Sequence, residues 1–78
     1  MADPIFAVFA EILRIPEEKI SDATSPDNTP EWDSLAAMFL IGGLEDRFEV
    51  EFSIADIMEM KTLANVRKVL TAKGVDLG

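Results

Sequence analysis

The residue types that carry out most protein chemistry are scarce in this chain, so candidate sites are few. The 78 residues contain no Cys and no His, which excludes a thiol nucleophile, a thiolate metal site and an imidazole general base. One serine remains of interest, in the segment EWDSL at residues 31–35. Ser34 cannot be a self-activated nucleophile, because the chain offers no imidazole and no suitable lysine base beside it. We therefore assign no catalytic residue and no metal ligand.

Ser34 is better suited to being modified by another enzyme. Asp33-Ser34 is a favourable helix start, because short polar side chains cap the free N–H groups of a first turn. Capping alone explains such a pair in most proteins. Here the serine also follows a long loop and precedes an apolar stripe, where it would be displayed. A phosphate attached to it would lie at the positive end of the helix dipole.

Apolar spacing and capping residues predict four helices. Asp3-Pro4 favours the start of the first helix, and Pro16 is expected to stop it. The second is expected from Asp33-Ser34 to about Glu49. Ser53 opens a short third helix through a capping box, and Thr62 opens the fourth, which Gly74 would end. The side chains expected to face inward are Ile5, Val8, Phe9, Ile12 and Leu13 in the first helix, Ala37, Leu40, Ile41, Leu44 and Phe48 in the second, Ile54, Ile57 and Met58 in the third, and Leu63, Val66, Val69 and Leu70 in the fourth.

The predicted fold class is all-α: a small four-helix bundle with three longer helices, one short third helix and a long loop between helices one and two. That loop, residues 16–33, contains three prolines, and so long a loop in a small domain tends to be functional. Ile20 and Ala23 are the expected anchors of the loop. We also expect Phe52 to be buried and Trp32 to plug the core from its edge.

The second helix has more apolar residues than one buried face can use. Leu35, Met38 and Phe39 form a second stripe beside the core stripe. Such a helix is either central in its bundle or offers one face to a partner. Glu45 and Asp46 continue the same side and favour the partner, as does methionine, which is frequent on adaptable surfaces. Whether Gly42-Gly43 permits a close approach or is merely tolerated stays open.

The net charge of −8 limits the kinds of partner. Residues 31–59 carry eight acids against one base, Arg47. This charge repels nucleic acid and anionic membrane surfaces and attracts a basic protein surface, although solubility alone also explains an acidic surface. The apolar run from Leu35 to Leu44 is too short to span a membrane. The acidic start MADP lacks the basic region of a signal peptide, so we expect a cytoplasmic monomer, one domain over residues 1–78.

The chain resembles the acyl carrier proteins over nearly its whole length. Asp-Ser-Leu at residues 33–35 is a weak signal by itself. It is followed nine residues later by Leu44-Glu45-Asp46-Arg47-Phe48, in an acidic chain of suitable length and helix pattern. This combination is a specific signature of the family.

The resemblance implies a carrier without catalytic activity. Ser34 would hold covalent 4′-phosphopantetheine, transferred from coenzyme A by a separate magnesium-dependent phosphopantetheinyl transferase. The thiol of that arm would carry acyl groups as thioesters to a loading ligase or acyltransferase and to synthases with basic docking surfaces. The residues that the resemblance assigns to partner binding are Asp33, Leu35, Met38, Phe39, Glu45, Asp46 and Ile57.

The chain departs from the fatty-acid carriers near the serine. Ala36 and Phe39 stand where those carriers usually have acids, Gly42 where they have a larger apolar contact, and Trp32 where the residue is usually smaller. These departures indicate a carrier of a specialised pathway rather than the housekeeping one. Asp33 argues against the peptidyl carriers, but aminoacyl or aryl loading remains an alternative. An unmodified acidic adaptor that docks through its second helix is the alternative of another class.

Overall fold

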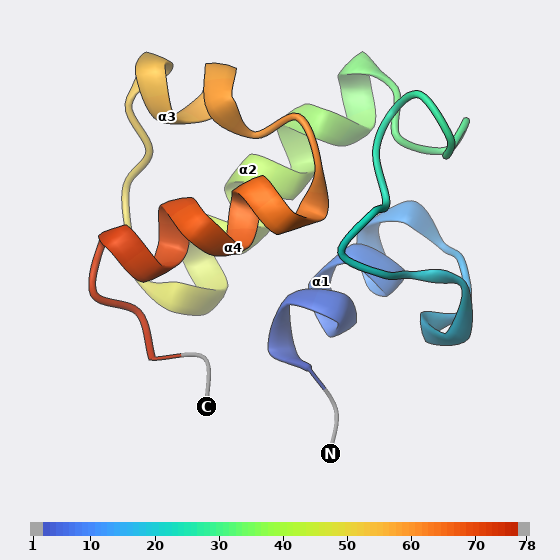
Figure 1. Cartoon of the computed structure of the whole chain (residues 1–78), viewed down its shortest axis with the longest axis horizontal. Coiled ribbons are helices and arrows are strands. Elements are labelled where there is room, and N and C mark those ends of the chain that lie inside the picture. Colours follow the sequence, from blue (N-terminus) through green and yellow to red (C-terminus); the bar gives the residue numbers. More distant parts are fainter. Residues whose placement is uncertain (1–2, 77–78) are drawn as a thin grey trace.

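The computed structural model describes residues 3–76, and within this range all regular secondary structure is helical. It contains α1 (Pro4–Leu13), α2 (Ser34–Phe48), the short α3 (Ile54–Glu59) and α4 (Leu63–Ala72), with one 3-10 turn, η1 (Glu17–Lys19). Figure 1 shows α4 in front of α2, with the long loop between α1 and α2 on the opposite side from α3. The predicted all-α bundle is confirmed.

Local chemistry sets the helix ends. The Asp3 carboxylate accepts the N–H of Ile5 at 2.9 Å and opens α1. Arg14 and Glu49 close α1 and α2 in the left-handed conformation, with φ of 59° and 55°. Non-glycine residues rarely adopt this conformation except at such caps. The stop of α1 is therefore Arg14, and Pro16 comes too late to set the boundary.

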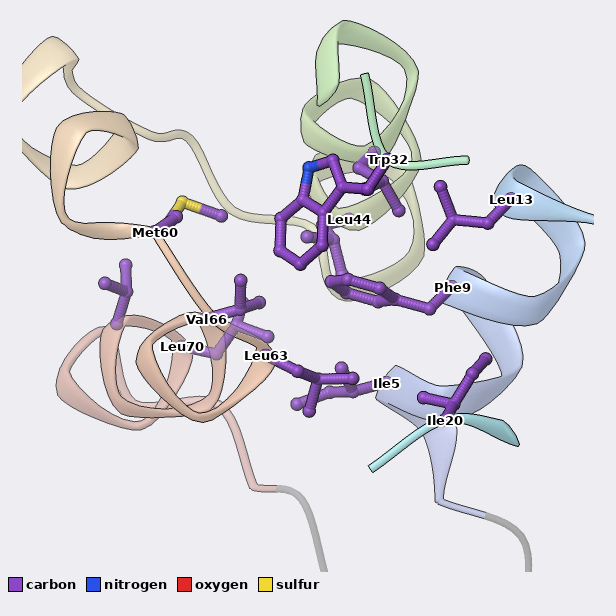
Figure 2. Packing of buried hydrophobic residues seen from close by; sticks show 12 residues of the cluster. Ile5, Phe9, Leu13, Ile20, Trp32, Leu44, Met60, Leu63, Val66 and Leu70 are labelled. Carbon is purple, nitrogen blue, oxygen red and sulfur yellow. The ribbon is translucent and has the colours of Figure 1, made fainter. Parts of the chain in front are cut away.

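The core lies where α1, α2 and α4 meet (Figure 2). Its largest fully buried side chain is Phe9. Trp32 is 6% exposed and meets Phe9 edge to face, with ring centroids 5.1 Å apart, so the expected plug is confirmed. The predicted stripes of α1, α2 and α4 face inward. The buried apolar residues are Ile5, Phe9, Leu13, Ile20, Trp32, Leu40, Leu44, Met60, Leu63, Val66, Val69 and Leu70.

The short helix α3 forms where it was predicted, but the expectation that its apolar residues face inward is wrong. Ile54, Ile57 and Met58 are 78%, 41% and 68% exposed. A helix of six residues is held by its flanks instead: Phe52 before it is half-buried against the core, and Met60 after it is buried. The spacing i, i+3, i+4 defines a shared face but does not say whether that face meets the core.

The loop before α2 is tied down by polar contacts. The carbonyl oxygens of Asp22 and Thr24 accept the N–H groups of Ala64 and Leu63 at 3.0 and 2.9 Å, and so satisfy free donors at the start of α4. The anchor expected at Ala23 is wrong, because Ala23 is exposed and the buried residue is Thr24.

The adjacent glycines of α2 have different surroundings. A Cβ at Gly43 would lie 3.5 Å from Ile12 and 3.6 Å from Val8, so α1 packs against α2 at this point. A Cβ at Gly42 would meet nothing within 4 Å. The close approach left open by the sequence therefore occurs at Gly43 and not at Gly42.

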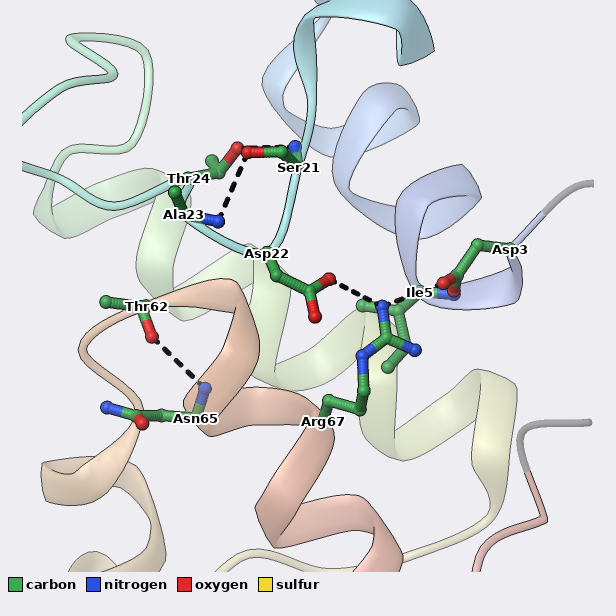
Figure 3. Close-up of polar contacts among 9 residues, drawn as sticks. All are labelled: Asp3, Ile5, Ser21, Asp22, Ala23, Thr24, Thr62, Asn65 and Arg67. Carbon is green, nitrogen blue, oxygen red and sulfur yellow. Dashed lines mark hydrogen bonds and ion pairs between the residues drawn. The ribbon is translucent and has the colours of Figure 1, made fainter.

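Arg67 of α4 joins three segments (Figure 3). Its guanidinium binds Asp3 at the start of α1 and Asp22 of the loop, both at 2.8 Å. Burial raises the pKa of Asp3, but the hydrogen bonds from Arg67 and from the Ile5 N–H outweigh it and hold that pKa below its ordinary value of 3.8. The folded state therefore binds a proton at the Asp3 carboxylate less readily than the unfolded chain does. The resulting stabilisation is complete above about pH 4 and is lost as the pH falls through the lowered pKa.

We expect Arg67→Met to lower the free energy of unfolding by about 1 kcal/mol at pH 7, because it removes both ion pairs of a partly buried cation. The difference from wild type should shrink at pH 3, because part of the stabilisation from the Asp3 carboxylate is lost below its ordinary pKa. Urea denaturation at both pH values measures it, with the exposed Lys68→Met on the same helix as the control. An equal difference at pH 3 and pH 7 would show that the contribution of Arg67 is packing and not charge.

Candidate functional site

The junction between the loop and α2 is held on both sides of the candidate serine. Trp32 is buried in the core. The next residue, Asp33, is the N-cap, and its carboxylate accepts the N–H of Ala36 at 2.8 Å. Ser34 is therefore the first residue of α2, and it is exposed. Because Trp32 is buried and Asp33 caps the helix, the Ser34 side chain points away from the core.

The four serines of the chain differ in what their hydroxyls do. Ser21 Oγ accepts the N–H of Ala23 at 3.1 Å, and Ser53 Oγ accepts the N–H of Asp56 at 3.1 Å as the cap of α3. Ser25 is buried. Ser34 alone is exposed with a hydroxyl that makes no hydrogen bond to the described part of the chain.

There is open space beside Ser34 for an attached group. A surface hollow of about 390 Å³ is lined by Pro26, Trp32, Asp33, Ser34 and Ala37. A second hollow, of about 290 Å³, lies between α2 and α3, and its lining includes Ala37 again. Because the two hollows share this small side chain, an extended group on the serine can lie across Ala37 towards α3. The residues present therefore fit a covalently attached arm.

The outward side of α2 is apolar near the serine. Leu35, Met38 and Phe39 are 61%, 71% and 58% exposed, so α2 is not a helix enclosed by its bundle. Ile57 of α3 lines the second hollow together with Met38. The structure thus brings these four predicted contact residues to one side of the molecule.

The two acids that follow on α2 have different environments. Asp46 is exposed. Glu45 is half-buried, and its carboxylate accepts the N–H of Phe52 at 2.9 Å. Glu45 therefore ties the segment that leads to α3 back onto α2.

Sequence reasoning missed Asn28, which organises the loop ahead of the site. Its side-chain oxygen accepts the N–H of Ser25 at 3.0 Å and the hydroxyl of Thr29 at 2.7 Å, and its amide donates to the Ala23 carbonyl at 2.8 Å. Ser25 and Thr29 are buried, while Asn28 itself is exposed. The turn-forming string SPDNTP at residues 25–30 was the available signal, since Asn side chains bond nearby backbone groups in turns.

The fold and the site define a small helical domain that presents an accessible serine at the start of α2. The model of the phosphopantetheine attachment site family matches residues 3–70. The chain belongs to this family. It is a carrier protein whose cofactor is covalent 4′-phosphopantetheine. A comparison with curated proteins finds no match. Within residues 3–76, no helix has both the length and the apolar character that crossing a membrane requires.

We expect Asp33→Ala to lower the free energy of unfolding by about 1 kcal/mol, because it removes the N-cap of α2. Asp33→Asn keeps a capping oxygen and should retain nearly all of the stability. Chemical denaturation followed by circular dichroism measures both. Equal losses for the two variants would contradict the capping role and point to the charge of Asp33 instead.

Proposed function

We propose that Ser34 carries the 4′-phosphopantetheine and that residues 1–78 form a single acyl carrier domain. The strongest support is that the Ser34 hydroxyl is exposed and makes no hydrogen bond to the described residues. The hydroxyls of Ser21 and Ser53 are hydrogen-bonded, and Ser25 is buried. The bound arm supplies a thiol, which the chain itself lacks, and this thiol holds acyl groups as thioesters.

The attachment is a phosphoryl transfer onto Ser34. Its Oγ forms a bond to the phosphorus next to the pantetheine of coenzyme A, the pyrophosphate P–O bond breaks, and adenosine 3′,5′-bisphosphate leaves. The serine proton goes to a base of the transferase, because the chain has no His or Cys and the neighbouring Asp33 carboxylate already accepts the N–H of Ala36. This chain contributes position: the N-cap Asp33 and the buried Trp32 hold the hydroxyl at the start of a helix, where the dipole favours a phosphate.

We further propose that the cargo is an acyl group and that the pathway is a specialised one. We favour acyl over aminoacyl or aryl groups on the resemblance of the sequence to acyl carriers. Ala36 and Phe39 replace acids near the serine, and Phe39 is 58% exposed, so this departure changes the outer surface. It supports a carrier of a specialised pathway that a dedicated ligase, acyltransferase or synthase recognises. Docking would use the exposed stripe with Asp33 and Asp46, while Glu45 contributes through its bond to Phe52.

An unmodified adaptor would use the same exposed stripe but would leave Ser34 without a role. The two functions separate in one assay. Purified protein is incubated with coenzyme A, magnesium and a phosphopantetheinyl transferase of broad specificity, and its intact mass is measured. We expect one pantetheinyl addition to wild type and to Ser21→Ala, and none to Ser34→Ala. An unmodified wild type, beside a control carrier that is modified, would support the adaptor.

A second assay addresses the pathway. An acyl-loaded wild-type chain should be elongated by a fatty-acid ketosynthase with a kcat/KM at least about tenfold below that of the ketosynthase's own carrier, because charges that steer docking are missing. The double variant Ala36→Asp/Phe39→Glu should recover part of the difference. Elongation of the wild-type chain as fast as of the ketosynthase's own carrier would contradict a specialised role.

A further inference from the structure

A surface groove of about 700 Å³ lies between α3 and α4, which are neighbours in the fold (Figure 1). Met58 of α3 and Val69 of α4 give it an apolar part. Its charged lining consists of Asp56, Glu59, Lys61, Lys68 and Lys73. No residue lines both this groove and one of the two hollows at the candidate site. The groove is therefore separate from the surroundings of Ser34.

The groove gathers basic side chains in an otherwise acidic chain. Three of the seven basic residues line it, against two acids, so its side chains sum to a charge of +1 in a chain of net charge −8. Lys73 is already paired, since its Nζ lies 2.8 Å from the Asp56 carboxylate. Lys61 and Lys68 are exposed, and neither forms an ion pair with another residue in the range 3–76. These two cations are therefore free to bind carboxylates from outside the chain.

The spacing of the lysines limits the kind of ligand. Lys61 lies just before α4, Lys68 is within the helix and Lys73 is its C-cap. A helix of ten residues is about 15 Å long, so a single phosphate cannot contact all three lysines. A ligand that fills the groove is elongated, with acidic groups for the lysines and apolar groups for Met58 and Val69.

We propose that the groove between α3 and α4 docks an acidic amphipathic segment of a partner protein, with carboxylates at Lys61 and Lys68 and apolar side chains over Met58. The proposal does not depend on the role of Ser34. It is a second docking surface, and its charge is opposite to that of α2 and the loop before it.

Charge favours a protein segment over the other elongated occupants. Nucleic acid would bring its phosphates against Glu59 and against a chain of net charge −8. A second copy would have to place its acidic residues in the groove, which is a head-to-tail contact between two chains that repel each other overall. An amphipathic segment satisfies both the two free lysines and the apolar lining.

The test is a titration of the ¹⁵N-labelled, unmodified full chain with two synthetic helical peptides, followed by amide chemical shifts. One peptide has leucines along one side and glutamates beside them, and the other has glutamine in place of every glutamate. We expect the glutamate peptide to shift the amide signals of Asn65, Lys68 and Val69, and to leave those of Leu35 and Phe39 unchanged. Its Kd should rise with salt, because exposed ion pairs are screened.

Charge variants show whether the two lysines bind the peptide. The Kd of the glutamate peptide should be about fivefold higher for Lys61→Gln/Lys68→Gln than for wild type, because two exposed ion pairs are lost. The matched control is Lys19→Gln/Arg47→Gln, which removes the same charge at two exposed positions outside the groove and should bind nearly as wild type does.

Three results would overturn the proposal: equal affinity for the two peptides, shifts confined to α2, or an equal loss of affinity in both double variants. Shifts of the groove signals by inorganic phosphate or a single-stranded oligonucleotide at the same concentrations would assign a different ligand and also overturn it. So would self-association of the wild type that Lys61→Gln/Lys68→Gln abolishes, because the occupant would then be a second copy. Since the titration uses the unmodified chain, its outcome is independent of whether Ser34 is modified.

Discussion

The edge-to-face contact between Phe9 and Trp32 determines how the chain enters α2. Trp32 is buried at the end of a long loop, and the next residue caps the helix. Because Trp32 and Asp33 are both held in place, the side chain of Ser34, the first residue of α2, points away from the core. The position of Ser34 is thus a consequence of packing and capping in its neighbours. The loop supports the same junction through Asn28 and through two carbonyl groups that bond the start of α4.

Helix α2 carries two stripes of residues with the same spacing, one that packs in the core and one that lies on the outer surface. One stripe, which includes Leu40 and Leu44, fills the core. The other begins at Leu35, two residues before Ala37, which is the first residue of the core stripe, and it stays exposed. A helix that is apolar on both sides would be prone to non-specific association, and the net charge of −8 opposes it. Repulsion between acidic surfaces therefore compensates for the exposed apolar stripe.

Local signals predicted most of the fold and the candidate site. The caps Asp3, Asp33, Ser53 and Thr62 each accept the backbone N–H expected of them, because capping depends on neighbours in sequence. The errors concern contacts between distant segments. Burial of α3 could not be read from its spacing, since that depends on where Phe52 and Met60 anchor it. The ion pairs of Arg67 with the carboxylates of α1 and the loop join residues 64 and 45 positions apart, which no local pattern reveals.

The most direct test of the account is to locate the cofactor on the protein isolated in its modified form. Cleavage after Lys19 and Arg47 gives a peptide of residues 20–47 that contains Ser21, Ser25 and Ser34, while Ser53 falls in the next peptide. Fragmentation of these peptides in a mass spectrometer assigns the pantetheinyl group to one residue. We predict that Ser34 alone is modified. Modification of Ser21, Ser25 or Ser53 would contradict it, because the structure gives each of those side chains a place within the fold.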